Sequence, residues 1–231
     1  KGFVKKVNLE SIKWCYKRYI DFPKYQVPST IFLQLRNQLP VVFITSLYGN
    51  SVVGLYGLAN TITKLPMTLV GNSIMNVFYS EIAATGRKNP MKIRKLGKKL
   101  MVQLTILGFI PFMILLIYGP VLFSYVFGSN WYEAGIYARI LSIYVYSNLV
   151  FSPISRVFEV FEKQRAKMFI DVISLVLVIF IFILAKFLSL SSYVAVIVYS
   201  IVMSMVYVYT YMLSDKYIRN EISRINQENI N

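Results

Sequence analysis

The sequence contains no histidine, and Cys15 is its only cysteine. A histidine-containing metal site and a Ser-His-Asp triad are therefore impossible within this chain. An intrachain disulfide bond is excluded as well. The patterns GxxxxGK(S/T), GxGxxG, HExxH, CxxC and GxSxG, which mark phosphate, zinc and nucleophile sites, are also missing. We expect no cofactor, no metal and no enzyme activity.

Acidic residues are scarce, since 10 Asp and Glu stand against 25 Lys and Arg and leave a net charge of +15. Such a balance is typical of nucleic-acid-binding proteins when the positive residues line one soluble helix face. Here they fall in blocks between apolar segments. We therefore expect no nucleic acid, and we expect the bilayer lipids to be partners through their anionic headgroups.

Apolar residues dominate the rest of the chain. Hydrophobic residues make up 56% of the 231 residues, and the mean hydropathy is +0.55. This predicts a multi-pass membrane protein. Because about 20 helical residues cross the hydrocarbon core, we predict an all-α bundle of six transmembrane helices within residues 27–213. The predicted crossings are residues 27–47, 51–80, 100–118, 138–158, 168–188 and 193–213.

The Lys and Arg residues alternate between the connections. Segments 1–26, 85–99, 159–167 and 214–231 hold seven, seven, three and three of them, whereas the alternate connections hold only Lys186. Positive residues accumulate on the cytoplasmic side of membrane proteins. Both termini are therefore predicted to be cytoplasmic, in the cytoplasmic (inner) membrane. We expect a basic loop between the second and third crossings and a polar, frayed cytoplasmic tail after the sixth.

Residues 1–26 mix positive and aromatic side chains without the apolar segment of a signal peptide. One interpretation is an amphipathic segment lying on anionic lipid, and the other is a solvated linker. With no initiator Met, the chain is expected to begin within a longer protein.

The second predicted crossing has polar residues where a simple anchor would be apolar. Since successive helical residues are rotated by about 100°, Asn60, Lys64 and Thr68 share one face, and Asn72 follows a turn later. A lysine facing lipid at mid-depth costs roughly 2.5–3.5 kcal/mol, so this face is predicted to line a cavity. The alternative is that Lys64 only packs or snorkels. Pro66 removes a backbone donor and predicts a kink or local opening.

Polar residues also occupy the first and fourth predicted crossings. Arg36 and Asn37 lie in the first, where Arg36 either sits at mid-depth or snorkels to the inner headgroups. Arg139 lies in the fourth, among hydroxyl and amide groups that either join helices or line a passage. The aromatic connector 119–135 before it predicts an interfacial half-helix on the far side.

Asp171 is interpreted as a helix N-terminal carboxylate, with ion coupling as the alternative.

Two short patterns lie beside these spans. The first is VGLYGLA at residues 53–59, leading to Leu65-Pro66, and the second is FGSNWYEAG at residues 127–135. With the order and spacing of the spans between Val27 and Leu213, they resemble the polysaccharide and O-antigen lipid flippases. These proteins form part of the multidrug/oligosaccharidyl-lipid/polysaccharide exporter superfamily.

The resemblance implies a fold of twelve to fourteen helices in two six-helix lobes, with a cavity between lobes and alternating access. It identifies this chain as the C-terminal lobe, with residues 1–26 as the inter-lobe linker and the N-terminal lobe missing. The implied substrate is an isoprenoid-pyrophosphate-linked oligosaccharide, flipped for polysaccharide, lipopolysaccharide or O-antigen biosynthesis. A polysaccharide polymerase and glycosyltransferases are the implied partner enzymes.

The chemistry of this substrate fits the polar residues of the spans. Lys64, helped by Arg36 or Arg139, would attract the pyrophosphate. Asn37, Asn60, Thr68 and Asn72 would exchange hydrogen bonds with sugar hydroxyls. These seven residues are the predicted substrate-binding site.

Three other functions remain open at this point. A multidrug/cation antiporter of the same superfamily would need acidic cation sites, which the spans hardly offer. A membrane-embedded glycan enzyme would need a clustered catalytic group or a larger outer loop. A structural anchor would not need polar faces at mid-membrane.

Overall fold

The computed structural model describes residues 9–20, 22–87 and 89–228, and every element in this part of the chain is helical. Five helical segments there are long and apolar enough to cross a membrane. Many large apolar side chains point outward, as expected when lipid is the solvent. The chain is therefore an all-α, multi-pass helical bundle.

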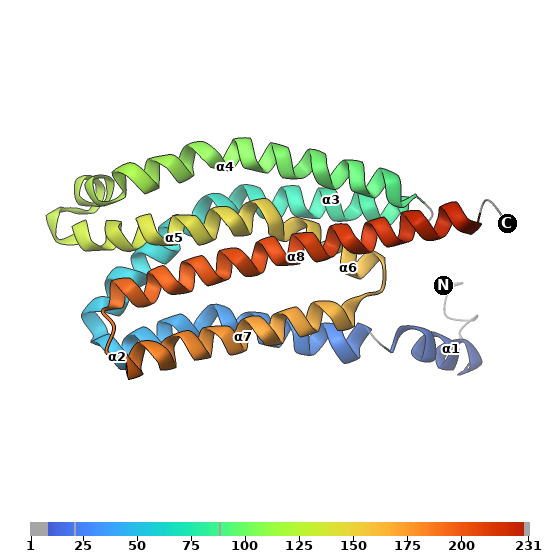
Figure 1. The fold of residues 1–231 in the computed structure, drawn as a ribbon, viewed down its shortest axis with the longest axis horizontal. Helices are drawn as coiled ribbons and strands as arrows, with labels where there is room; N and C mark the ends of the chain where they lie inside the picture. Colours follow the sequence, from blue (N-terminus) through green and yellow to red (C-terminus); the bar gives the residue numbers. More distant parts are fainter. Residues whose placement is uncertain (1–8, 21, 88, 229–231) are drawn as a thin grey trace, which may run out of the picture.

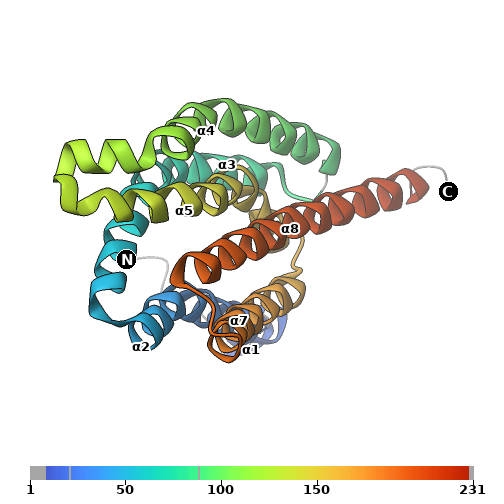
Figure 2. The same cartoon turned by 60° about the vertical axis from the view of Figure 1, so that its left-hand side comes forward.

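The helices are, in chain order, α1 Leu9–Tyr19, α2 Val27–Pro66, α3 Asn72–Thr85, α4 Pro90–Phe127, α5 Tyr132–Phe151, α6 Val157–Val160, α7 Gln164–Phe187 and α8 Ser192–Glu228. Two π-helical turns flank α2, and two 3-10 turns flank α5; they lie at Phe22–Gln26, Met67–Gly71, Ser129–Trp131 and Ser152–Arg156. α7 packs along the first part of α2, and α5 packs along α4 (Figure 1). α8 lies between these two groups and contacts both α5 and α7 (Figure 2).

α2 reverses direction at Gly49. The φ of 85° and ψ of 177° at this residue are not helical, and glycine adopts a positive φ at low cost. The continuous run Pro23–Thr85 has 63 residues, about 95 Å if straight, which is roughly three times the hydrocarbon thickness. Gly49 instead divides it into a first leg, residues 27–48, and a second leg, residues 50–66. The division falls between the predicted crossings 27–47 and 51–80.

Pro66 is followed directly by the π-helical turn Met67–Gly71. Because proline has no N–H, the i→i−4 ladder is interrupted there, and the helix widens before it continues as α3. The opening lets the backbone approach α5, since a Cβ added at Gly71 would lie 3.1 Å from Leu149 Cδ1. The predicted local opening at Pro66 is thus confirmed.

The described parts of the four basic segments gather at one end of the bundle, which we call the basic end. It holds α1, the start of α4, the α6–α7 connection and the end of α8, while the bend within α2 and the α4–α5 and α7–α8 connections lie at the opposite end (Figure 1). This arrangement follows the charge alternation of the sequence, from which a cytoplasmic basic end is predicted.

α4 is longer than predicted at both ends. The basic segment expected as a loop is helical from Pro90, because Asn89 caps the helix by accepting a hydrogen bond from Lys92 N at 3.0 Å. Proline at the first helical position favours the same start. At the other end the helix continues to Phe127, so the prediction of a separate interfacial half-helix in the connector is wrong.

The prediction that the chain frays after Ser214 is also wrong, because α8 continues to Glu228. Asp215 holds this extension against α4. Its carboxylate accepts from Arg94 Nε at 2.9 Å and from Arg219 Nε at 2.7 Å, and the residue is only 7% exposed. These charge-assisted hydrogen bonds stabilise the basic end of the bundle.

Replacing Asp215 with asparagine should lower the free energy of unfolding by about 1 kcal/mol, because the amide gives Arg94 a weaker acceptor than the carboxylate. The midpoint of thermal unfolding in detergent measures the effect. Glu228→Gln is the matched control, since Glu228 is exposed on the same helix and pairs with Arg224 only at 3.5 Å. An equal midpoint for Asp215→Asn and wild type would show that the contact does not hold α8.

Aromatic residues fill the bundle from its middle toward the end that holds Gly49. Tyr56 packs edge-on against Tyr137 with ring centroids 6.3 Å apart. Phe182 and Tyr199 join α7 to α8 at 6.2 Å. All four residues belong to one buried cluster, so packed side chains fill the interior toward this end.

Candidate functional site

A polar cavity of about 430 Å³ lies in the half of the bundle nearer the basic end. Its walls come from the first leg of α2, from Lys64 and the π-helical turn after it, and from α3, α5, α7 and α8. The residues that carry charge around it are Arg36, Lys64, Arg156, Glu159, Lys167 and Asp171. The cavity therefore collects charged groups inside an otherwise apolar bundle.

Arg36 forms the deep wall of the cavity. The residue is 5% exposed. Its Nη2 donates to the Tyr207 hydroxyl at 2.9 Å, its Nη1 donates to Ser174 Oγ at 3.2 Å, and its guanidinium lies 5.4 Å from the centre of the Tyr207 ring. No carboxylate of the described residues forms an ion pair with it. Arg36 is therefore held in place by neutral groups and keeps its full positive charge.

Lys64 projects into the same cavity from the second leg of α2. Its Nζ lies 5.5 Å from the centre of the Tyr144 ring. Within the described part of the chain it makes no ion pair and no side-chain hydrogen bond, and the residue is only partly buried. A ring is a weak partner, contributing about 0.5–2 kcal/mol, so the ammonium remains available to a ligand.

The other charges of the cavity neutralise one another. Arg156 Nη1 lies 2.7 Å from Glu159 Oε1, and Lys167 Nζ lies 2.6 Å from Asp171 Oδ1. Arg36 and Lys64 thus give the cavity two positive charges without carboxylate partners. In a low-dielectric site such charges attract an anion far more strongly than they would in water.

Asp171 does not sit at a helix N-terminus, contrary to the interpretation from sequence. α7 begins at Gln164, two turns earlier, and Asp171 is 1% exposed. Its carboxylate pairs with Lys167 and accepts a hydrogen bond from the Ser29 hydroxyl of the first leg. Asp171 therefore joins α7 to α2 beside the cavity.

The structure brings four of the seven predicted site residues together, since Arg36, Asn37, Lys64 and Thr68 all line the cavity. The other three do not line it. Asn72 is exposed on α3. Asn60 lies one turn farther from the basic end than Lys64, with its Oδ1 buried and without a hydrogen-bond partner among the described residues.

Arg139 also lies outside the cavity. Its Nη2 donates to the Ile117 carbonyl at 2.8 Å, which ties α5 to α4. The guanidinium has a packing role here.

Sequence reasoning missed the tyrosines that support the two cations. Tyr144 lies on α5 and Tyr207 on α8, and no local pattern connects either residue with α2. The Lys167–Asp171 ion pair could have been predicted from the sequence, because residues four apart on a helix are neighbours. That spacing predicts the ion pair but not its place in the cavity wall.

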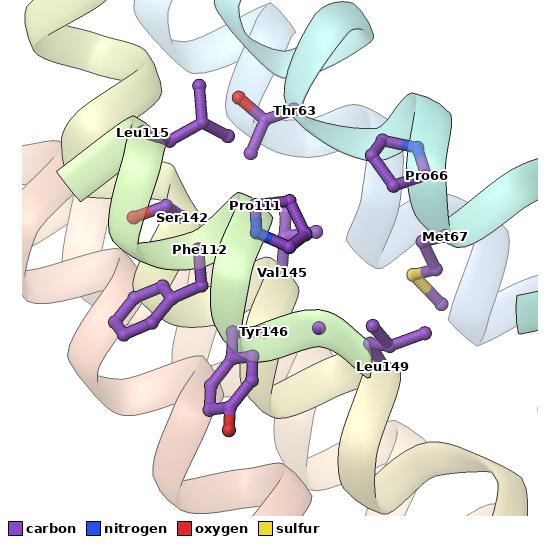
Figure 3. Close-up of a pocket in the computed structure, with 11 residues that line it drawn as sticks. Thr63, Pro66, Met67, Pro111, Phe112, Leu115, Ser142, Val145, Tyr146 and Leu149 are labelled. Atoms are coloured by element: carbon purple, nitrogen blue, oxygen red, sulfur yellow. The ribbon is translucent and has the colours of Figure 1, made fainter. Parts of the chain in front are cut away.

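A second cavity, of about 30 Å³, adjoins the polar one at Met67, which lines both (Figure 3). Pro66 lies on one side of it and Pro111 of α4 on the other. Its lining is almost entirely apolar, and its volume is about that of one water molecule. This cavity is too small for a ligand. It is a small void beside the π-helical turn.

Replacing Tyr207 with phenylalanine removes the hydroxyl that accepts from Arg36 but keeps the ring beneath the guanidinium. Because one hydrogen bond contributes about 1 kcal/mol, the pyrophosphate site expected from the sequence should show an about fivefold higher dissociation constant for inorganic pyrophosphate in this variant. Calorimetric titration of the purified protein measures it. Tyr211→Phe is the control, since Tyr211 lies one turn further along α8, where its ring packs against Phe151. Equal affinities in both variants would contradict the assigned role of Tyr207.

Comparison with protein families decides which class of protein contains this cavity. Residues 6–136, more than half of the chain, match the model of the family described as polysaccharide biosynthesis protein. The chain belongs to the polysaccharide biosynthesis protein family. The matched region contains Arg36 and Lys64, and the family supports a polysaccharide exporter type of membrane protein. No curated protein and no solved structure matches the chain.

Proposed function

We propose that this polysaccharide biosynthesis protein is one lobe of a transporter that flips an isoprenoid-pyrophosphate-linked oligosaccharide across the cytoplasmic membrane by alternating access. The observation that carries the proposal is the pair Arg36 and Lys64, two cations that share a polar cavity without carboxylate partners. A pyrophosphate carries the opposite charge and offers several acceptor oxygens to a guanidinium and an ammonium.

The neutral polar groups of the cavity suit a sugar. Asn37 and Thr68 line it one residue and one turn along α2 and its π-helical turn from the two cations, and Asn148, Ser152 and Thr210 line it from α5, the 3-10 turn after α5, and α8. Amide and hydroxyl groups are neutral, and they both donate hydrogen bonds to sugar hydroxyls and accept hydrogen bonds from them. The glycan would thus occupy the half of the cavity nearer the cytoplasm while the lipid tail stays in the bilayer.

A second lobe is part of the proposal. Gln34 and Gln38 are exposed on the first leg of α2, and Asn72 and Asn76 are exposed on α3. Amide side chains at the depth of the hydrocarbon core are costly when they face lipid. We assign this surface to the other lobe, across which the cavity would be completed, and we regard glycosyltransferases and a polymerase as partners of the whole transporter.

The antiporter alternative has less support. A cation-coupled antiporter requires a carboxylate that can bind its ion, but Glu159 and Asp171 are both paired with cations in the cavity wall. We also propose that the protein transports and does not catalyse. The Ser29 hydroxyl does donate to the Asp171 carboxylate in the lining, but that carboxylate is already paired with Lys167 and is therefore a poor base.

Complementation tests the proposal. The full reading frame, or this chain joined to a related N-terminal lobe, is expressed in a strain that lacks its polysaccharide flippase, and surface polymer is measured. Restored polymer is the expected result. A stable, inserted protein that restores no polymer with any of several glycans would overturn the flippase function, and drug efflux by the same protein would support the antiporter instead.

A further inference from the structure

The first turns of α4 carry a row of lysines that the cavity does not use. Lys92, Lys95 and Lys99 fall within about 60° of one another around the helix, and all three are exposed. The row rises about 10 Å along the axis. We call these three residues the lysine ladder.

The ladder differs from the arginines in the same segment. Arg94 pairs with Asp215 at 2.9 Å, and Arg87 pairs with Glu162 at 2.9 Å. No ladder lysine forms an ion pair with a described residue. The arginines therefore join parts of the bundle, while the lysines present positive charge outward.

The same face of α4 continues as a surface suited to lipid. Beyond Lys99 it presents Ile106 and Ile110, which are 67% and 66% exposed and lie on the same side of the helix as the ladder. An exposed apolar face followed by exposed cations marks the boundary between hydrocarbon and headgroups. The ladder spans about the depth of one headgroup layer, on the basic end.

The helix itself contributes to the same charge. Asn89 and Pro90 fix the start of α4 directly before Lys92, so the ladder stands on a rigid helix rather than a loop. Pro90 has no N–H and the Lys92 N–H donates to Asn89, so the helix adds partial positive charge on the same side through its macrodipole. The ladder and the helix start thus offer ordered positive charge to a phosphate at the membrane surface.

We propose that the lysine ladder of α4 is a binding site for the headgroup of an anionic phospholipid in the cytoplasmic leaflet. The phosphate would sit between the lysine ammonium groups, and the acyl chains would lie along the apolar face that ends in Ile106 and Ile110. This site is separate from the cavity and does not depend on the proposed transport function.

Lipid titration of the purified full chain in detergent tests the site. The probes are fluorescent phosphatidylglycerol and phosphatidylcholine with identical acyl chains. Because each lysine near an anionic surface contributes about fivefold, we expect the triple variant Lys92→Gln, Lys95→Gln, Lys99→Gln to weaken phosphatidylglycerol binding on the order of 100-fold at low salt. Phosphatidylcholine binding should not change. The single variant Lys95→Gln, which alters one exposed side chain, should weaken phosphatidylglycerol binding about fivefold.

The matched control removes three positive charges from the basic end but not from the ladder: Lys163→Gln, Arg165→Gln, Lys216→Gln. It should retain wild-type preference for phosphatidylglycerol. An equal loss in this control would overturn the proposal in favour of general charge attraction. Unchanged binding in the ladder variants would overturn it directly, and displacement of the lipid by millimolar glycerol phosphate would identify a site for soluble anions instead.

Discussion

Replacing Lys64 with glutamine is expected to abolish polysaccharide export while the protein still inserts and folds. Two unit charges 4 Å apart attract by about 4 kcal/mol at the effective dielectric constant of a partly exposed protein site. Losing this attraction lowers affinity for a pyrophosphate roughly 1,000-fold. Because the Lys64 ammonium lies 5.5 Å from the centre of the Tyr144 ring and forms no ion pair with a described residue, the folded state loses little when its charge is removed.

Two further variants separate charge from other effects. Lys64→Arg keeps the positive charge and should retain a measurable part of the export. Lys186→Gln removes an exposed lysine near the end of α7, far from the cavity, and should export as wild type does. Surface polymer is quantified in the flippase-deficient strain, and membrane abundance is measured for every variant. Full export by a stable Lys64→Gln protein would remove Lys64 from the proposed site.

Replacing Gly135 with alanine is expected to prevent normal packing of α4 on α5. A Cβ at this position would lie 2.4 Å from Pro120 Cα and 2.5 Å from the Gly119 carbonyl oxygen. Both neighbours are backbone atoms, so no side-chain rotation can relieve the overlap, and the helices must separate. Small residues at such crossings are what allows close helix packing in membranes. We expect a loss of about 3 kcal/mol or more, at the upper end for overpacked interiors.

Gly54→Ala is the matched control for this effect. Gly54 is also helical, but a Cβ added there meets no atom within 4 Å, and alanine favours the helix by about 1 kcal/mol over glycine. The yield of monodisperse protein and the thermal midpoint in detergent should fall for Gly135→Ala and should be kept or raised for Gly54→Ala. Equal behaviour of the two variants would show that the Gly119–Gly135 crossing tolerates separation.

Sequence patterns predicted the features that depend on residues close to one another in the chain. The turn at Gly49 and the opening after Pro66 follow from the conformations that glycine and proline allow, and the grouping of basic segments at one end follows from their alternation. The start of α4 at Pro90 was also readable, because an asparagine followed by proline is a helix-start signal. It was missed because the lysines and arginines after it were interpreted as a loop.

Contacts between distant residues could not be read in the same way. The extension of α8 depends on Asp215 and Arg94, which lie 121 positions apart. The helical face predicted for the second crossing correctly grouped Lys64 with Thr68, but its periodicity does not say how far a cavity extends along the helix. Asn60 lies outside the cavity because the buried cluster that contains Tyr56 and Tyr137 fills the bundle at that level.

The two cavity cations rest against aromatic rings, and this affects how fast a carrier can turn over. A cation that rested on a carboxylate would have to give up a buried ion pair, at a cost of about 3–5 kcal/mol, each time a ligand arrived. Arg36 and Lys64 lie 5.4 and 5.5 Å from the ring centres of Tyr207 and Tyr144, contacts that an anion need not break. In the proposed transporter, capture would start from two cations that no carboxylate neutralises, and the same ring contacts would persist after release.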